Sequence, residues 1–247
     1  MDSNKQRKKS AAIIVSAGKG NRMNSKIMKQ YLLLDDKPII AHTLKVFDTC
    51  PLIDDIVLVV PPGDIEYCRD NIVNKYGLKK VGNIVEGGPE RQHSVYNGLG
   101  CIGKEMEIVV IHDGVRPLVT HEIISDSIEQ ADLYGCTVAA VDVKDTIKVA
   151  DERGFVVNTL ERSTLRAMQT PQTFRKEVIL KAYEYAMENG IYGTDDATLA
   201  EYAGFKVKLV KGNYENIKIT TPEDMIMATA VINARRTNNR KTRRFWL

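Results

Sequence analysis

The stretch from Ile13 to Lys29 places a buried-strand pattern directly before a loop of small and cationic residues. Ala11–Val15 is an uninterrupted apolar run, which is typical of a central strand in a parallel sheet. Ser16-Ala17-Gly18-Lys19-Gly20 follows without a bulky side chain, so the backbone can approach a ligand and its N–H groups can cradle phosphates. Positive charge surrounds this loop, from Lys19, Arg22, Lys26 and Lys29. We therefore expect a polyphosphate at the end of the first strand.

Taken alone, this loop does not identify its ligand. Gly18 and Gly20 are not followed by the third glycine of a dinucleotide-binding loop, and the loop lacks the Gly-Lys-Ser/Thr ending of a P-loop. A strand-to-loop turn with a solvated basic face explains the same residues. Segments further along the chain have to decide between the two interpretations.

The rest of the chain alternates strand-like and helix-like segments. Such alternation predicts an α/β fold in which a mostly parallel, twisted sheet lies between two layers of helices. We expect strands near residues 56–60, 83–86, 108–111, 137–141, 205–210 and 216–220. Helices are expected over 38–50, 64–76, 93–99, 122–134, 176–188 and from residue 221 onward. The chain has 247 residues, 43% of them hydrophobic, which suffices for one such domain or at most two small ones.

Residues 142–164 break this alternation. Short alternating runs flank the turn-forming Asp151-Glu152-Arg153-Gly154, which predicts a β-hairpin that projects from the sheet as an arm. An exposed hairpin is prone to aggregate unless another surface covers it, so we expect a second subunit at the arm. The domain is expected to span residues 11–233, between basic tails at 1–10 and 234–247 that we expect to be disordered.

The positive charge of the chain is concentrated in those two tails. They carry nine net positive charges, so the body between them carries six net negative charges, because the whole chain has a net charge of +3. A nucleic-acid-binding face would carry its charge on the folded domain. The charge distribution therefore argues against a nucleic-acid partner.

Two further observations bear on the compartment. The chain has no run of about 18 apolar residues, and MDSNKQRKKS lacks a hydrophobic signal segment, so we expect a cytoplasmic protein without a membrane span. The four cysteines are far apart and show no metal-binding spacing; they are Cys50, Cys68, Cys101 and Cys136. We expect reduced thiols in the core.

A second functional segment is expected where the strand at 108–111 ends, in His112-Asp113-Gly114-Val115-Arg116-Pro117. Ligands of open α/β sheets bind outside the carboxyl ends of the strands, so Asp113 and Arg116 would offer a carboxylate and a phosphate-binding guanidinium near the glycine-rich loop. A turn closed by a local ion pair between these two residues is the alternative. His112 points to the opposite side of the strand and is expected to pack in the core rather than to catalyse.

Two segments nearer the C-terminus complete the candidates. Asp195-Asp196, within Thr194–Ala197, favours a capped helix start over a carboxylate metal site. Lys218 precedes the terminal helix and is a further cation within reach of the site.

Together these segments resemble the 2-C-methyl-D-erythritol 4-phosphate cytidylyltransferase family, nucleotidyltransferases with a GT-A-like, Rossmann-like fold. The resemblance covers about residues 11–233. It rests on motifs in a specific order: A-G-x-G-x-R-M from Ala17 with Lys-Gln at Lys29, G-G-x-E-R-x-x-S-V from Gly87, H-D-x-x-R-P from His112, D-T-x-K from Asp145, Q-T-P-Q-x-F from Gln169, T-D-D-A from Thr194, and N-I-K-x-T-x-P-x-D from Asn216.

The resemblance implies a role for each matched residue. The loop would bind the CTP triphosphate through Ser16, Ala17, Gly18 and Gly20, with the catalytic cations Arg22 and Lys29. The cytosine and ribose would lie by Gly88, Arg91 and Ser94. The sugar-phosphate acceptor would be surrounded by Asp113, Arg116, Thr146, Arg162, Thr170 and the catalytic Lys218. In this family the arm embraces a second subunit, so Thr146 and Arg162 would act in the neighbour's site of a homodimer.

The implied reaction transfers a cytidylyl group from CTP to 2-C-methyl-D-erythritol 4-phosphate and releases pyrophosphate, within the non-mevalonate route to isoprenoid precursors. The acceptor oxygen is already anionic, so the reaction needs positioning and charge neutralisation rather than a nucleophilic side chain. Mg²⁺ or another divalent cation would bridge the triphosphate oxygens. Asp113 is the candidate residue to orient either this cation or the acceptor.

Other functions remain open at this point. The ribitol 5-phosphate cytidylyltransferases share the glycine-rich loop and Q-T-P-Q but tend to lose T-D-D-A, which this chain keeps at Thr194–Ala197. A transferase for another nucleotide, such as UTP, would use the same elements, because Gly88–Ser94 do not settle the base. A non-catalytic nucleotide-binding module would lack cations that this chain has: Arg22, Lys29, Arg116, Arg162 and Lys218.

Overall fold

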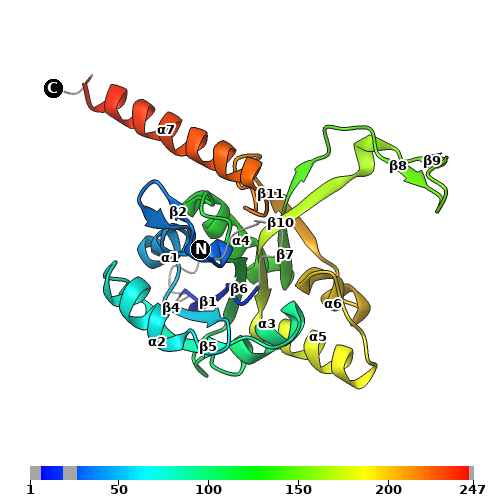
Figure 1. Cartoon of the computed structure of the whole chain (residues 1–247). Helices are drawn as coiled ribbons and strands as arrows, with labels where there is room; N and C mark the ends of the chain where they lie inside the picture. The colour runs from blue at the N-terminus through cyan, green and yellow to red at the C-terminus, as the bar shows by residue number, and fades with distance from the viewer. Residues whose placement is uncertain (1–6, 19–26, 245–247) are drawn as a thin grey trace, which may run out of the picture.

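A seven-stranded sheet runs through the middle of the described molecule (Figure 1). The structure is a computed structural model that describes residues 7–18 and 27–244. The strand order is β11-β7-β10-β6-β1-β4-β5. The strands are β1 (Ser10–Val15), β4 (Asp55–Val60), β5 (Val81–Glu86), β6 (Ile108–Asp113), β7 (Cys136–Asp142), β10 (Arg166–Arg175) and β11 (Lys208–Lys211). Two short ribbons lie outside this sheet: β2 (Leu33–Leu34) with β3 (Lys37–Pro38), and β8 (Lys148–Ala150) with β9 (Val156–Thr159).

Most neighbouring strands are parallel, as the alternation predicts. β1 pairs in parallel with β4 and β6, β4 with β5, and β11 with β7. β10 is antiparallel to both β6 and β7, because the chain enters it from the arm rather than through a crossover helix. In the register of β1 with β6, Val15 lies opposite Asp113. The glycine-rich loop and the segment that begins at Asp113 therefore leave the sheet side by side.

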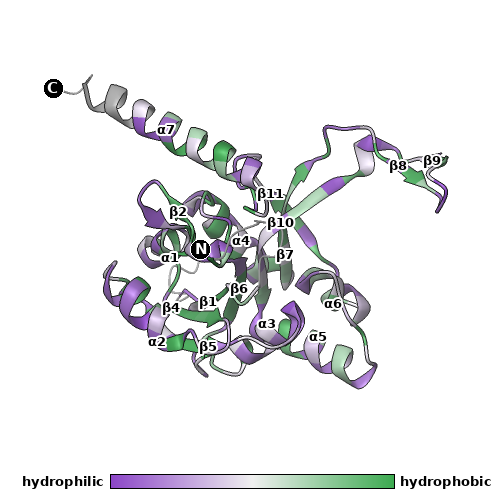
Figure 2. Ribbon diagram, in the orientation of Figure 1, coloured by the Kyte–Doolittle hydropathy of each residue, from purple (hydrophilic) through white to green (hydrophobic). Residues whose placement is uncertain are grey.

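Helices cover both faces of the sheet, so the predicted three-layer α/β sandwich is confirmed. One face carries α1 (Ile39–Thr49), α2 (Ile65–Cys68) with the π-helical turn Arg69–Asn74, and α4 (His121–Tyr134). The other carries α3 (Arg91–Leu99), α5 (Lys176–Glu188) and α6 (Asp196–Tyr202). Along β1, Ala12 and Ile14 face the first layer and Ala11 and Ile13 the second, all fully buried. Figure 2 shows this central part of the sheet in the colours of apolar residues.

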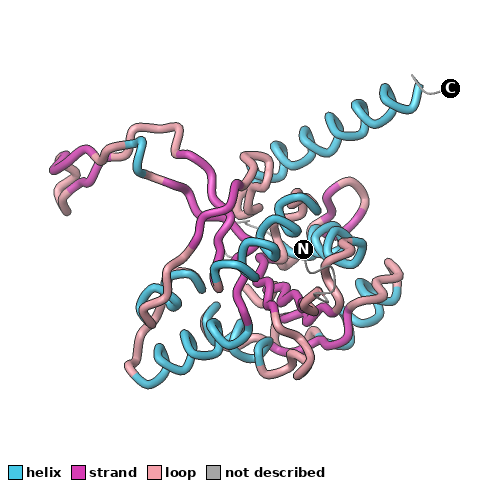
Figure 3. The backbone as a smooth tube through the Cα atoms, turned by 180° about the vertical axis from the view of Figure 1, so that it is seen from behind, coloured by secondary structure: helices cyan, strands magenta, loops and turns pink. Residues whose placement is uncertain are grey.

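The predicted hairpin projects from the body (Figures 1 and 3). β8 and β9 are antiparallel, and the Asp151 N–H donates to the Phe155 carbonyl at 2.9 Å across the turn. Apolar side chains of the arm face solvent, with Phe155 69% and Val157 66% exposed. The arm thus keeps an apolar surface that its own chain does not cover.

The segment Asn216–Thr220 is irregular, so the strand predicted there is wrong. Its Ile219 N–H donates to the Val115 carbonyl at 2.9 Å, and Ile219 is fully buried in a small cluster beside α7 (Pro222–Arg244). The segment therefore follows the loop after β6 instead of a sheet edge, which brings Lys218 to Asp113. The late strand predicted at 205–210 is shifted toward the C-terminus and is found as β11.

Parts of both basic tails, which the sequence predicts to be disordered, are folded against the body. Ser10 is fully buried at the start of β1, and Arg7 pairs with Asp54 at 2.6 Å. α7 continues past residue 233, and its Arg235 pairs with Glu215 at 2.7 Å. The acidic body supplies partners for these cations, which explains the difference. Seen from both sides, α7 and the arm leave the body in diverging directions (Figures 1 and 3).

The prediction of core thiols is confirmed for three of the four cysteines. All four thiols are free; Cys101 is partly buried and the other three are buried. None of the helices within residues 7–18 and 27–244 combines the length and apolarity that a membrane crossing requires.

Candidate active site

A cleft of about 830 Å³ opens at the carboxyl ends of β1 and β6. Its lining comes from the loop after β1, the turn between β5 and α3, and the segment around Asp113, and it includes Lys29 and Lys218. These segments meet because the carboxyl ends of parallel strands face the same edge of a sheet. The volume suits a ligand of nucleotide size.

Close backbone packing forms the wall between the loop after β1 and α3. A Cβ on Gly87 would lie 2.3 Å from the Ala17 Cβ, and a Cβ on Gly88 would lie 2.4 Å from the His93 Cβ, so neither position accepts a side chain without a shift. The Gly88 N–H donates to the Ser94 Oγ at 3.1 Å, which fixes the turn onto α3. A ligand on this wall therefore meets backbone rather than flexible side chains.

Lys29 enters the cleft from a short 3₁₀ helix, Lys29–Tyr31. Tyr31 anchors this helix, because its hydroxyl donates to the Asp64 carboxylate at 2.7 Å and lies 3.2 Å from the Cys68 Sγ. Burial and these two neighbours raise the pKa of Tyr31. The backbone that carries Lys29 is thus tied to the start of α2. The predicted Gly20 and Arg22 lie outside the described residues.

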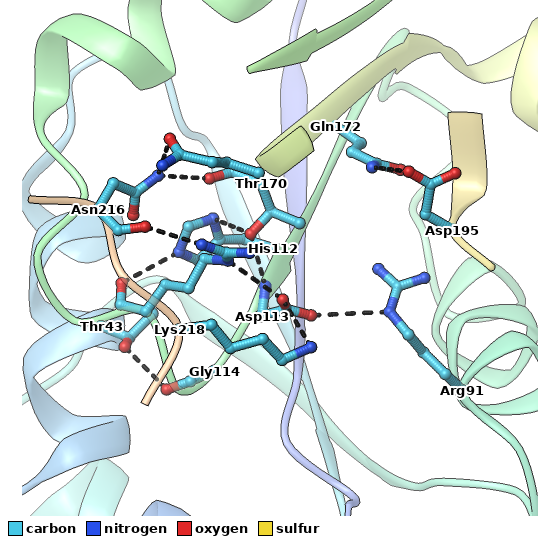
Figure 4. A network of polar contacts seen from close by, with 12 residues as sticks. Thr43, Arg91, His112, Asp113, Gly114, Thr170, Gln172, Asp195, Asn216 and Lys218 are labelled. Carbon is cyan, nitrogen blue, oxygen red and sulfur yellow. Dashed lines mark hydrogen bonds and ion pairs between the residues drawn. The ribbon is translucent and has the colours of Figure 1, made fainter. Parts of the chain in front are cut away.

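Three cations surround the Asp113 carboxylate, and Figure 4 labels two of them, Arg91 and Lys218. Its Oδ2 lies 3.0 Å from the Lys218 Nζ and 3.3 Å from the Arg116 Nε, and its Oδ1 lies 3.6 Å from the Arg91 Nε. Burial alone would raise the pKa of Asp113, but Lys218, Arg91 and Arg116 outweigh burial and hold it well below its usual range. Asp113 is therefore ionised, and the group as a whole keeps a net positive charge that attracts an anion.

Buried hydrogen bonds hold the Asp113 side of the cleft together. Arg116 Nη1 donates to the Asn216 carbonyl at 2.8 Å, and the Asn216 Nδ2 donates to the Thr170 carbonyl at 2.8 Å. Asn216 is fully buried. These bonds join the loop after β6, strand β10 and the segment before α7, which fixes the backbone of Lys218.

His112 packs in the core, as the strand alternation predicts. It is fully buried, its ring centre lies 4.9 Å from that of Phe47, and burial lowers its pKa to about 3. Its Nδ1 lies 2.9 Å from the Thr170 Oγ1 and its Nε2 3.2 Å from the Arg116 carbonyl oxygen. The imidazole is therefore neutral and bonded on both nitrogens.

Arg91 connects Asp113 to a second buried carboxylate. Its Nη2 donates to the Asp196 Oδ2 at 2.8 Å, and Asp196 is 1% exposed. The Tyr183 hydroxyl donates to the other Asp196 oxygen at 2.7 Å. Gln172 accepts from the Asp196 N–H at 2.9 Å, so the Q-T-P-Q and T-D-D-A segments form one network with Arg91.

Comparison with known proteins identifies the family to which the chain belongs. Residues 10–234 match the family model described as 2-C-methyl-D-erythritol 4-phosphate cytidylyltransferase. A relative of that name from Caldanaerobacter subterraneus subsp. tengcongensis is 51% identical, over 88% of this chain and 96% of the relative. The chain belongs to the 2-C-methyl-D-erythritol 4-phosphate cytidylyltransferase family.

Further comparisons agree with this family. A relative of the same name from Alkaliphilus metalliredigens is 50% identical, over 92% of this chain and 95% of the relative. The crystal structure of 4-diphosphocytidyl-2C-methyl-D-erythritol synthase from Anaerococcus prevotii superposes with a TM-score of 0.81 at 34% identity, covering 92% of this chain and 96% of that one. The fold of this cytidylyltransferase family is thus shared over nearly the whole chain.

The cleft of this cytidylyltransferase-family chain gathers most of the residues that the sequence singles out. Its lining includes Ser16, Ala17, Gly18, Lys29, Gly88, Arg91, Ser94, Asp113 and Lys218. Arg116 and Thr170 lie directly behind Asp113, where Arg116 contacts its carboxylate and Thr170 accepts from its N–H at 3.1 Å. Thr146 and Arg162 are exposed on the arm and are not brought to the cleft of their own chain.

Sequence reasoning missed how much of the family's site is built behind the cleft. Asp195 caps α6 as predicted, since its side chain accepts from the Thr198 N–H at 2.9 Å, but Asp196 pairs with Arg91. Gln172 and Asn216 also hold the site, and neither received a role. Their signal was their place in motifs, next to residues that did. Within residues 7–18 and 27–244, no three carboxylates, imidazoles or thiols gather as a metal site.

Proposed function

We propose that this chain transfers the cytidylyl group of CTP to 2-C-methyl-D-erythritol 4-phosphate, giving 4-diphosphocytidyl-2-C-methyl-D-erythritol and pyrophosphate. One observation carries the proposal: a single cleft joins the backbone wall at Gly87 and Gly88 to the cations gathered around Asp113. The wall suits a nucleotide and the cations suit an anionic acceptor. Membership of the family supplies the identity of both substrates.

The chemistry requires two anions to meet. An acceptor phosphate oxygen attacks the α-phosphorus of CTP, and the new P–O bond forms as the bond to the bridging oxygen of pyrophosphate breaks. No side chain has to accept a proton, because the attacking oxygen is anionic. The protein contributes alignment and positive charge. We assign the alignment and the positive charge to Lys29 and Arg22 on the triphosphate side and to Lys218 and Arg116 on the acceptor side.

A divalent cation such as Mg²⁺ is proposed to arrive bound to the triphosphate, where it neutralises charge. The contacts of Asp113 do not fit a metal ligand, since both of its oxygens already face cations. A carboxylate in that arrangement orients Lys218 and Arg116 for the acceptor. We therefore give Asp113 the acceptor-orienting role rather than a metal-binding one.

A homodimer formed through the arm is the proposed assembly. The arm exposes Phe155, Val156 and Val157, each more than half exposed. Apolar surface of this extent favours a protein partner. The dimer would bring Thr146 and Arg162 to the neighbour's cleft. The cytoplasm is the proposed compartment, in line with four free thiols.

Pyrophosphate release tests the reaction. Purified protein is given CTP and Mg²⁺ with 2-C-methyl-D-erythritol 4-phosphate or, in parallel, ribitol 5-phosphate, and UTP replaces CTP in a third series. We expect release with CTP and the first acceptor alone. Release with ribitol 5-phosphate only would move the chain to polyol-phosphate metabolism, and silence in every series would contradict catalysis.

A further inference from the structure

His112 lies behind the cleft, on the face of β6 opposite to Asp113. It is fully buried against Phe47 and does not line the cleft, whereas its neighbour Asp113 does. Figure 4 shows its ring among the bonds that join Thr170, Asp113 and the loop after β6. The ring thus reaches the acceptor-side residues from the core.

The two hydrogen bonds of the ring fix its tautomer. A carbonyl oxygen only accepts hydrogen bonds, so the nitrogen 3.2 Å from the Arg116 carbonyl, Nε2, carries the proton. In a neutral imidazole the other nitrogen, Nδ1, is then an acceptor. It takes the Thr170 hydroxyl proton across 2.9 Å. The Thr170 hydroxyl is therefore committed as a donor to His112.

The same Thr170 hydroxyl also hydrogen-bonds to the backbone of Asp113, so its position affects Asp113. Its Oγ1 accepts the Asp113 N–H at 3.1 Å. The pairing of β10 with β6 begins at Gln172 opposite Ile111, and the intervening Pro171 has no N–H to donate. The side-chain bond from Thr170 thus ties β10 to β6 at Asp113, beyond the last paired residue.

We propose that His112 is a positioning residue for the acceptor side of the cleft, acting through the Thr170 hydroxyl and the Arg116 carbonyl. This rests on the proposed function. His112 touches no substrate; it sets the backbone of two residues whose side chains share one ion pair, Asp113 and Arg116. The nucleotide side of the cleft contains none of its bonded partners among the described residues.

Three substitutions separate the two bonds. His112→Asn keeps an acceptor near the position of Nδ1 but cannot reach the Arg116 carbonyl. His112→Gln keeps a donor near the position of Nε2 but leaves the Thr170 hydroxyl without its acceptor. His112→Phe keeps the packing on Phe47 and loses both bonds. Because each lost bond is neutral, we expect the KM for 2-C-methyl-D-erythritol 4-phosphate to rise about tenfold for Asn or Gln and about a hundredfold for Phe.

The readout is the split between the two substrates. The KM for CTP, and CTP binding measured by calorimetry without acceptor, should stay within about twofold of wild type, since the bonds lie on the acceptor side. Thr137→Val is the matched control, because the Thr137 hydroxyl is buried in β7, two strands away from β6, and donates to the Ser127 carbonyl at 3.0 Å. It should lower Tm and leave both KM values unchanged.

Two outcomes would overturn the proposal. In one, the His112 variants lose Tm with both KM values unchanged or raised equally, as a purely structural residue would. In the other, nitrogen NMR of histidine-labelled protein finds the proton of the His112 ring on Nδ1. The NMR measurement needs no activity or variant stability, so it stands even if the His112 variants do not fold. Failure of the proposed function is distinct, because wild-type protein would then release no pyrophosphate.

Discussion

Arg91 and Asp196 form an ion pair at 2.8 Å, although 105 residues separate them in the chain. The pair joins the start of α3 to the start of α6. Asp196 is 1% exposed, whereas the Arg91 side chain is 28% exposed and reaches the cleft. Asp196 is therefore the buried anchor that holds a cationic wall of the cleft in place.

Asp196→Asn should damage both stability and nucleotide use. Removing one partner of a buried pair leaves Arg91 with only the more distant Asp113 carboxylate, so we expect a loss of about 2 kcal/mol in the free energy of unfolding. Arg91 would then turn toward Asp113, and kcat/KM for CTP should fall at least about tenfold. Urea unfolding and steady-state kinetics measure the two effects. Glu201→Gln, on the exposed side of α6, should change neither; normal kinetics in Asp196→Asn would restrict Asp196 to a structural role.

Lys218→Ala should impair the acceptor far more than the fold. Lys218 pairs with Asp113 at 3.0 Å but is 37% exposed, so its loss should cost less than about 1 kcal/mol of stability. The loss of a charge aimed at the reacting phosphate should lower kcat by about a hundredfold. Initial rates at saturating CTP measure the effect. Lys181→Ala, an exposed lysine on α5, is the control; equal rates in both variants would remove Lys218 from the mechanism.

The fold could be predicted from the sequence because buried strands and amphipathic helices follow from local periodicity. Ala11–Val15 and residues 56–60 read as central strands and are β1 and β4. Residues 216–220 alternate polar and apolar side chains, as a half-buried strand does, but form no strand, because Ile217 and Ile219 pack in a separate cluster beside α7. A periodic pattern reports which side chains are buried; it does not report whether a neighbouring strand is available.

The site could be predicted in part for a related reason. Residues that point into the cleft, such as Lys29 and Asp113, follow strands or glycine-rich turns, and this position marks them. Asp196 and Asn216 act through partners that lie 105 and 46 residues away in sequence, and only the folded chain identifies these partners. The sequence therefore predicts Asp196 at the start of a helix but does not predict its ion pair with Arg91.

The stability of the protein should fall between pH 7 and pH 5, partly through His112. Burial lowers the pKa of His112 to about 3, below the ordinary value of about 6.5 in the unfolded chain. Between pH 7 and pH 5 the unfolded state therefore binds a proton at His112 that the folded state does not bind. This difference removes about 2 kcal/mol from the free energy of unfolding as the pH falls over this range. Urea unfolding of wild type and His112→Asn at pH 7, 6 and 5 measures the difference. Equal losses in the two proteins would mean that folded His112 titrates normally; His42, also shifted downward by burial, contributes to both alike.

The arm offers a test of whether two chains share one site. Arg162 and Thr146 are exposed on the arm. Arg162 Nη1 donates to the Lys144 carbonyl at 3.0 Å, which is a hydrogen bond within the arm itself. If they complete the neighbour's cleft, Arg162→Ala and Lys29→Ala should each reduce kcat strongly in pure form. Arg162→Ala would damage the neighbour's cleft, to which the arm contributes Arg162. Lys29→Ala would damage the cleft of its own chain.

Co-expression of these two variants should then restore activity. A mixed dimer combines the intact cleft of the Arg162→Ala chain with the intact arm of the Lys29→Ala chain, so it holds one complete site. Random pairing makes half of the dimers mixed, and activity should return to about a quarter of wild type. Lys29→Ala with Lys218→Ala is the matched control, because both changes lie in the cleft and their mixed dimer has no complete site. If mass spectrometry shows mixed dimers but the first pair stays inactive, Arg162 does not serve the neighbouring cleft.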